Sequence, residues 1–439
     1  MKTNFNQMNI EELYRYYQQA AGVTTDTRTI EKGTIFFALK GDNFNGNRFA
    51  EEAIKKGAAY AVIDEPLDTA NDRLILVDDV LETLQQLANH HRRQLTIPVI
   101  GITGSNGKTT TKELIREVLS QKFTVTSTQG NLNNHIGVPL TLLSIDKETE
   151  IAIVEMGANH QHEIGFLCNI AEPKYGLITS IGKSHLEGFG SMENLINTKK
   201  ELYDALENNN GVVFFNQEDN LLSKIVPTSI QHLSYGTSEE VYCRGMINDR
   251  ESFYFAFDLF GDAGRITSIK TRLTGSYNFT NALAASAVGR YFGVSDEEIK
   301  IALEEYAPGN NRSQIQQTSN NTLILDAYNA NPSSMTLAID NLNTIDHHDK
   351  FFILGDMLEL GEISREEHRS ILNQLRKNNL KGVLIGSCFY ELQDEFSEFD
   401  FYPTTDEYLT KLKETPLKDK LILIKGSRGI RLEKCVECL

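Results

Sequence analysis

Short apolar runs alternate with amphipathic stretches of helical length through the central part of the chain. The apolar runs cover residues 99–103, 151–155, 176–180 and 212–216, and the helical patterns cover residues 109–121 and 192–207. Regular alternation of strand and helix is typical of a mostly parallel sheet covered by helices. We therefore expect an α/β domain here.

The same alternation recurs on both sides of this segment. The expected N-terminal strands are residues 34–39, 59–63 and 74–77, and the expected helices there are residues 51–56 and 80–94. The expected C-terminal strands are residues 322–326, 351–355, 382–386 and 421–425. Pro98 and the loop-forming stretch at 308–312 are natural boundaries. The prediction is an α/β protein of three domains, residues 1–95, 96–309 and 310–439, in which the last contains a second, smaller doubly wound sheet.

Composition narrows the class of protein. The chain has 439 residues, which is too long for one ordinary core, and its formal net charge is −17 without a basic block. Phosphate neutralisation needs a basic face, so nucleic acid is not an expected partner. The polar start and the absence of an apolar run near 18 residues predict a cytoplasmic, soluble protein with no transmembrane segment. Cys435 and Cys438 form an isolated pair, for which free thiols are the favoured interpretation over a zinc or redox site.

The strongest local signal lies at residues 99–110, where an apolar strand enters a glycine-bearing loop that leads to Lys108 and Thr109. Such a loop can direct backbone N–H groups at phosphate oxygens, and the following helix N-terminus adds a positive dipole end. Lys108 would reach the β- and γ-phosphates and Thr109 would bind Mg²⁺. Ile102 stands where the strict motif has glycine, so an ordinary strand–turn–helix is the alternative.

Three further positions are candidates for a metal site. Glu155 ends an apolar strand, and His185 follows another, so both would face the crevice at the carboxyl end of a parallel sheet. Lys199 and Lys200 are adjacent in a helix, where side chains point ~100° apart, so at most one faces the site. Taken singly, each of these has a structural or solvent-facing alternative.

Motifs spread over nearly the whole chain resemble the Mur ligases. They lie at residues 101–111, 131–139, 155–159, 184–190, 198–201, 275–282, 326–332 and 425–428. The resemblance implies an N-terminal UDP-sugar-binding domain, a central P-loop-type ATP-binding domain, and a Rossmann-like C-terminal domain that closes over the site.

The resemblance also implies roles for individual residues. Lys108, His185 and Lys199 would be catalytic, and ATP and about two Mg²⁺ ions would be the cofactors. The metal ligands would be Thr109, Glu155, His185 and Lys199, the last as a carbamate formed from CO₂, with Lys200 left open as the alternative. The expected ATP contacts are Gly104, Ser105, Asn106, Gly107, Lys108, Thr109, Thr110, Asn281, Arg312 and Asp326.

One segment favours a branch of the family. Residues 328–332, Tyr-Asn-Ala-Asn-Pro, resemble the branch that adds D-alanyl-D-alanine to a UDP-N-acetylmuramoyl tripeptide in peptidoglycan precursor synthesis. The expected substrate contacts are Thr27, Arg28, Asn134, Tyr328, Asn329, Asn331 and Lys425. We expect a monomer. A tripeptide-forming or folylpolyglutamate-type ligase is the nearest alternative, and a nucleotide-dependent switch is the alternative from another class.

Overall fold

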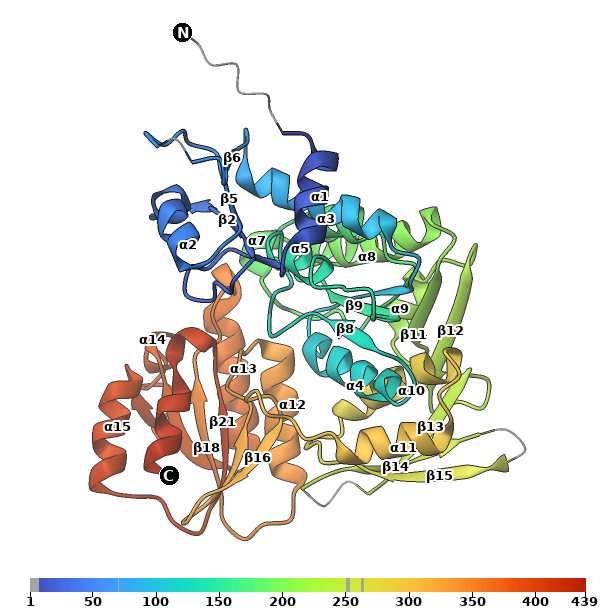
Figure 1. The fold of residues 1–439 in the computed structure, drawn as a ribbon. Helices are drawn as coiled ribbons and strands as arrows, with labels where there is room; N and C mark the ends of the chain where they lie inside the picture. The colour runs from blue at the N-terminus through green and yellow to red at the C-terminus, as the bar shows by residue number, and fades with distance from the viewer. Residues whose placement is uncertain (1–7, 70, 250–252, 262–263) are drawn as a thin grey trace.

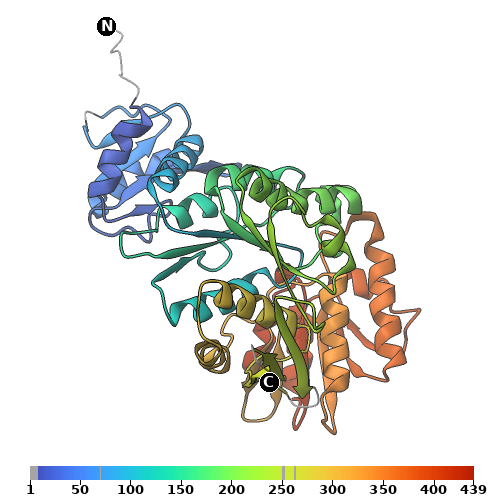
Figure 2. The same cartoon turned by 90° about the vertical axis from the view of Figure 1, so that its right-hand side faces the viewer.

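The computed structural model describes residues 8–69, 71–249, 253–261 and 264–439. Its described residues form three successive bodies, each built around its own sheet (Figure 1). In the view of Figure 2 the N-terminal body lies at the upper left and the C-terminal helices at the lower right, with the central body between them. No helix in the described ranges is both long enough and apolar enough to span a membrane.

The N-terminal body has a four-stranded parallel sheet in the order β1-β2-β5-β6. The strands are β1 (Val23–Thr24), β2 (Ile35–Phe37), β5 (Tyr60–Ile63) and β6 (Leu74–Leu76). The helices are α1 (Ile10–Gln19), α2 (Ala50–Lys56) and α3 (Val80–Gln94), and a small hairpin joins β3 (Lys40–Gly41) to β4 (Phe44–Asn45). The expected strands and both expected helices are confirmed. Helix α3 also contacts α5 (Gly137–Leu142) and α6 (Glu163–Ala171), so it joins this body to the central one.

The central body has a nine-stranded sheet in the order β15-β14-β13-β12-β11-β10-β7-β9-β8. The parallel strands are β7 (Val99–Thr103), β8 (Val125–Ser127), β9 (Ile151–Glu155), β10 (Tyr175–Ile178), β11 (Val212–Asn216), β12 (Gln231–Gly236) and β13 (Cys243–Asp249). Helices α4 (Lys108–Ser120), α10 (Asn278–Tyr291) and α11 (Asp296–Glu305) cover one face, and α6 and α8 (Met192–Asn208) cover the other. Every residue of β7 and β9 is buried, which explains their unbroken apolar runs.

Strands β14 (Ala256–Phe260) and β15 (Ile266–Lys270) extend this sheet in antiparallel fashion, and the sequence prediction missed them. In β15 only Thr267 and Ile269 are buried, between exposed neighbours. A strand covered on one face alternates and gives no continuous apolar run. A search for continuous runs therefore finds the buried parallel strands and passes over this edge.

The C-terminal body has a six-stranded sheet in the order β16-β17-β21-β18-β19-β20. Its strands are β16 (Gln314–Gln317), β17 (Thr322–Leu325), β18 (Lys350–Gly355), β19 (Lys381–Ile385), β20 (Asp400–Tyr402) and β21 (Leu421–Lys425), all parallel except β16. Helices α12 (Pro332–Thr344), α13 (Ser364–Lys377) and α14 (Ser387–Tyr390) cover one face, and α15 (Thr405–Glu414) covers the other. The expected doubly wound sheet is confirmed. The boundaries 95/96 and 309/310 fall outside every strand and stay a prediction.

Candidate active site

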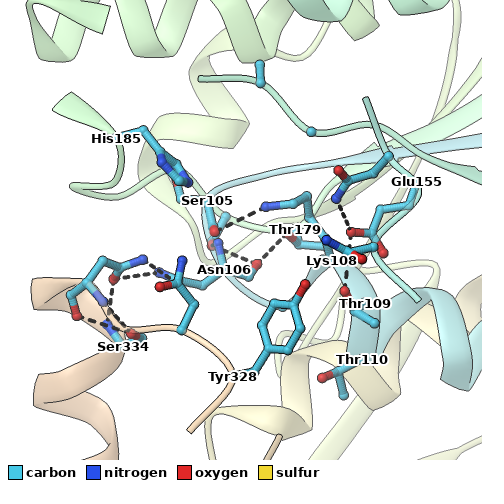
Figure 3. A pocket seen from close by; sticks show the side chains of 18 of the residues that line it. Ser105, Asn106, Lys108, Thr109, Thr110, Glu155, Thr179, His185, Tyr328 and Ser334 are labelled. Atoms are coloured by element: carbon cyan, nitrogen blue, oxygen red, sulfur yellow. Dashed lines mark hydrogen bonds between the residues drawn. The ribbon is translucent and has the colours of Figure 1, made fainter. Parts of the chain in front are cut away.

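A cavity of about 1170 Å³ opens where the three bodies meet. Its lining combines the loop after β7, the end of β9, helix α6, the start of α10 and the segment after β17 (Figure 3). Parallel strands place their carboxyl ends at one edge of a sheet, and that edge is where ligands bind in open α/β sheets. Here such edges of the central and C-terminal sheets face the same space.

Two glycines shape the loop after β7. At Gly104 the φ angle is +147°, and a Cβ there would lie 2.1 Å from the Thr179 hydroxyl. Gly107, at φ +83°, precedes the first turn of α4, and a Cβ there would lie 2.7 Å from Asn281 Oδ1. A side chain at either position would collide with its neighbour, so the loop approaches the segment that follows β10, and helix α10, as only glycine allows.

Lys108 folds back over this loop. Its Nζ donates hydrogen bonds to the carbonyls of Gly104, at 2.7 Å, and Ser105, at 3.3 Å. Burial lowers the pKa of Lys108, and the nearby Glu155 carboxylate opposes that shift. A half-buried cation held by carbonyls at a helix N-terminus is suited to neutralise an incoming phosphate.

Glu155, which is only 1% exposed, has one carboxylate oxygen engaged and one left over. Its Oε1 accepts hydrogen bonds from Asn133 Nδ2 at 2.8 Å and from the Thr109 hydroxyl at 3.2 Å. Its Oε2 has no hydrogen-bond partner among the described residues, and Lys112 Nζ lies 4.0 Å away. A buried charged oxygen without a partner is costly, and a bound cation would satisfy it. The residues present therefore fit a divalent metal ion.

The adjacent residues Lys199 and Lys200 lie on different faces of helix α8. The buried positions of α8 include Leu195, Lys199 and Leu202, so they follow the helical repeat and place Lys199 on the inner face. Burial, with the charge of Lys108 added, places the pKa of Lys199 well below its ordinary value. Lys200 points elsewhere and pairs with Asp204 at the surface.

His185 follows β10 in a left-handed conformation at φ +51° and lines the cavity. Its Nδ1 lies in close contact with the Glu359 carboxylate of the C-terminal body, without hydrogen-bond geometry. Burial lowers the pKa of His185, although the Glu359 charge opposes the shift. In the view of Figure 3 His185 and Glu155 lie on opposite sides of the phosphate loop.

The C-terminal body contributes a polar group of its own to the cavity. Lys425 Nζ donates to Asp326 Oδ2 at 2.6 Å and to the Asn329 carbonyl at 3.2 Å. The Arg312 guanidinium lies 3.6 Å from the centroid of the Tyr328 ring. These residues line the cavity together with Ser105, Asn106, Gly107, Lys108, Thr109, Thr110, Asn134, Glu155, His185, Asn281 and Asn331, all expected from the sequence.

Some expected site residues do not line this cavity. Thr27 and Arg28 lie in the N-terminal body, where Arg28 is exposed and pairs with Asp26 at 2.6 Å. Gly104 and Lys199 are buried and are not among the lining residues. Asn134, the third residue expected to bind the UDP-muramoyl substrate, does line the cavity. Its Oδ1 accepts the Gly137 N–H at 2.9 Å near the start of α5.

The structure adds three residues that sequence reasoning missed. Asn133 and Lys112 both approach the Glu155 carboxylate, and Glu359 approaches His185. Lys112 follows Lys108 by one helical turn, a spacing that puts both on one face and could have indicated it. Glu359 carries no such local signal, because its contact is made between two bodies.

Family models match the chain in three consecutive segments. A Mur ligase family catalytic domain matches residues 19–92, a Mur ligase middle domain matches 102–289, and a Mur ligase glutamate ligase domain matches 311–428. A UDP-N-acetylmuramoyl-tripeptide–D-alanyl-D-alanine ligase of Bacillus subtilis (strain 168) is 35% identical over 96% of this chain and 94% of its own. The chain belongs to the Mur ligase family.

Other Mur ligases are similar to this chain in sequence or structure over nearly its whole length. A protein of the same name from Escherichia coli (strain K12) is 33% identical over 95% of this chain and 93% of its own. A crystal structure of MurF from Acinetobacter baumannii has a TM-score of 0.86 at 30% identity and covers 98% of both chains. The MurF ligase of Thermotoga maritima in complex with ADP has a TM-score of 0.82 at 27% identity, over 96% of this chain and 97% of its own. The expected fold class is confirmed.

Proposed function

We propose that this Mur ligase joins D-alanyl-D-alanine to a UDP-N-acetylmuramoyl tripeptide in an ATP-dependent, ADP-forming reaction of peptidoglycan precursor synthesis. The observation that carries the proposal is the shared cavity, in which the phosphate loop faces the Tyr328–Asn331 segment of the C-terminal body. The curated relatives that align with nearly the whole chain have this activity as their name. ATP and a UDP-linked precursor are cytoplasmic compounds, so we place the reaction in the cytoplasm, with the enzyme a monomer.

The chemistry requires an activated carboxyl group. A carboxylate oxygen of the tripeptide attacks the γ-phosphorus of ATP, the bond to ADP breaks, and an acyl phosphate results. The dipeptide amine then bonds to the carbonyl carbon, phosphate leaves, and the nitrogen loses a proton. Both steps crowd anionic oxygens together, so Lys108 and the N–H groups of residues 104–110 act mainly by positioning and charge neutralisation.

Mg²⁺, when bound, would supply further positive charge and polarise phosphoryl oxygens. We propose that Thr109, Glu155, His185 and Lys199 hold two Mg²⁺ ions between them. The orphaned oxygen of Glu155 supports this set. Neutral histidine is the form that binds metal, and the lowered pKa of His185 favours that form.

We further propose that Lys199, and not Lys200, forms the carbamate. The reaction needs a neutral amine, whose nitrogen bonds to the carbon of CO₂ and releases a proton, and the product is an anionic oxygen donor. Burial and the Lys108 charge favour the neutral amine of Lys199. Lys200 is half-exposed and paired with Asp204 at the surface, away from these groups.

The remaining contacts divide between the two substrates. Asn281, Arg312 and Asp326 would contact the nucleotide, beside Gly104–Thr110 of the loop. Tyr328, Asn329, Asn331 and Lys425 would line the dipeptide site. Thr27, Arg28 and Asn134 would hold the UDP-muramoyl substrate, and the distance of Thr27 and Arg28 from the cavity lining suits the far end of that long molecule.

The test is phosphate release from ATP and Mg²⁺ with the muramoyl tripeptide, with and without D-alanyl-D-alanine. We expect phosphate release to require both the muramoyl tripeptide and D-alanyl-D-alanine. The product should be heavier than the muramoyl tripeptide by the mass of one dipeptide less one water. Turnover with a single amino acid and a shorter precursor would move the chain to the tripeptide-forming branch. Turnover with a folate would move it to the folylpolyglutamate type.

A further inference from the structure

A carboxylate of the C-terminal body meets a histidine of the central body beside the cavity. Glu359 Oε2 lies in close contact with Nδ1 of His185, without hydrogen-bond geometry in this structure. Because the carboxylate lies at Nδ1, the second ring nitrogen, Nε2, is the one left for another partner. The two residues are far apart in sequence, and each belongs to a loop between elements of its own body.

Histidines that bind metals through one ring nitrogen usually donate the N–H of the other to a carboxylate or carbonyl. That partner fixes the tautomer and the ring orientation. We propose that Glu359 is a positioning residue for the metal site: it accepts the Nδ1–H of His185 and so presents the Nε2 lone pair to the metal ion. The inference rests on the proposed role of His185 as a ligand.

The loop that carries Glu359 is held rigidly. The Met357 N–H donates to His368 Nε2 at 3.0 Å, and the Leu358 N–H donates to the Ser427 hydroxyl at 2.9 Å. The Asp356 carboxylate accepts the N–H groups of Cys388 and Phe389, both at 2.9 Å. Three consecutive residues are thus fixed just before Glu359, and Asp356 and His368 are occupied by these bonds.

Both partners also hold unusual backbone conformations. Glu359 has φ +63° and His185 has φ +51°, a region that side-chain-bearing residues seldom adopt. Strained residues of this kind persist where the surroundings fix them, and they cluster at functional sites. The two left-handed residues contact each other across the boundary between the central and C-terminal bodies, which we call the seam. A contact that only filled space would not require both conformations.

Neighbouring contacts bring the two loops together. Lys183 Nζ pairs with Glu367 Oε1 at 2.6 Å, and the Glu187 N–H lies 3.5 Å from the Glu359 carbonyl. The carboxylate therefore reaches His185 only while the C-terminal body is docked. Docking of that body completes the support of the metal ligand, which couples metal affinity to closure.

The first test is Mn²⁺ affinity, measured by electron paramagnetic resonance on the full-length chain. We expect Glu359→Ala to weaken binding by about 10- to 100-fold, the usual effect of losing a ligand's carboxylate partner. Glu359→Gln should lose less, because its amide oxygen still accepts the N–H. Glu362→Ala, which removes an exposed carboxylate of the next turn, is the matched control and should bind as the parent does.

His185→Ala separates this inference from the proposed site. If Mn²⁺ affinity falls in His185→Ala but is unchanged in Glu359→Ala, the inference is overturned and the proposed ligand stands. If His185→Ala binds Mn²⁺ like the parent, the ligand role and the inference fall together. Neither result depends on ligase turnover, so failure of the proposed reaction would be seen separately.

A second readout needs no metal. In protein labelled with ¹⁵N-histidine, the ring signals lost in His185→Ala identify this residue. We expect the Nδ1–H tautomer in the parent and a shift toward Nε2–H in Glu359→Ala, while Glu362→Ala keeps the parent's signals. A His185 ring that stays in the Nδ1–H form without Glu359 would overturn the inference, and a merely structural role for Glu359 would produce that result.

Discussion

The central side of the cavity and the contacts that join it to the C-terminal body are built differently. On the central side the charged groups are buried: Glu155 is 1% exposed, and Lys112 and Lys199 are each 2% exposed. The contacts that join the central body to the C-terminal body use more exposed groups, such as the Glu359 side chain at 56% exposure and the Lys183 side chain of the central body at 54%. Buried unpaired charge is costly, whereas an exposed ion pair contributes only about 0–1 kcal/mol.

The difference indicates a division of labour. The buried charges of the central side are unfavourable until phosphate and metal ions bind and neutralise them. The binding groups are therefore already in place before the substrates arrive. The C-terminal side is joined by weak contacts, so it can open and close. Closure that excludes water would protect an acyl phosphate from hydrolysis. The predictions below test each side, beginning with the largest expected effect.

Loss of the loop lysine should remove the function of the central side. We expect Lys108→Ala to lower phosphoryl transfer on the order of 10³-fold or more, because its charge lies inside the phosphate loop. ADP formation in single-turnover experiments is the measurement. Retained ADP formation would contradict the assignment of the phosphate site.

The adjacent lysines of α8 should differ sharply. Lys199→Ala should reduce turnover on the order of 10²–10³-fold, since it removes a buried group beside the site. Lys200→Ala loses only a surface pair with Asp204 and should stay within about twofold of the parent. The two variants are compared at saturating Mg²⁺ and bicarbonate. A larger loss in Lys200→Ala would reverse the assignment of the carbamate.

The hydrogen bonding between Asn331 and Asn106, which joins the C-terminal body to the phosphate loop, should matter less. Asn331 Nδ2 donates to Asn106 Oδ1 at 2.8 Å, and Asn331 Oδ1 caps α12 through the Ser334 N–H. Asn331→Ser keeps a capping group but is too short to reach the phosphate loop. We expect turnover to fall by up to about tenfold, the value of one hydrogen bond, with an unchanged thermal midpoint.

A double-mutant cycle provides the control for that prediction. If the two asparagines act through their mutual bond, adding Asn106→Ala to Asn331→Ser should cost little more than either change alone. Fully additive losses would show that the seam contact is not what either residue contributes.

The smallest expected effect concerns the support of the Glu359 loop. Burial lowers the pKa of His368 below its ordinary value of 6.5. The unfolded chain therefore binds a proton as the pH falls below 6.5 while the folded chain does not, and stability is lost in that window. The slope is at most about 1.4 kcal/mol per pH unit.

The comparison for this group is His368→Gln, which cannot titrate. Thermal midpoints of parent and variant are measured at about pH 7.5 and pH 5.5, either side of the ordinary histidine pKa. We expect the parent's advantage over the variant to shrink at the lower pH. An advantage that is equal at both pH values would show that His368 is not held neutral by the fold.

The sequence alone predicts those elements and site positions that depend on a local pattern of residues. Strand 99–103, the helix after Lys108 and the strand-end position of Glu155 all follow from runs of apolar residues and glycines, and the structure confirms these elements. The choice of Lys199 over Lys200 needs the direction of a helix face, which the burial of α8 supplies. Their chemical roles stay proposals.

Other features depend on packing between distant segments. Strands β14 and β15, at the antiparallel end of the central sheet, lack a continuous apolar run, and Lys112 is a charged residue in a place where burial is not expected. Glu359 reaches His185 only through the docking of two bodies. No local propensity encodes such a contact, so it requires the assembled structure.

The most direct test of the central claim is to trap the activated carboxyl group. Borohydride reduces an acyl phosphate to an alcohol but leaves a carboxylate intact. With ATP, Mg²⁺ and the muramoyl tripeptide but no dipeptide, we predict a tripeptide whose terminal carboxyl is reduced, found by mass spectrometry. Adding D-alanyl-D-alanine first should remove it in favour of the amide. A failure to trap any reduced tripeptide, while the amide product forms normally, would contradict the account.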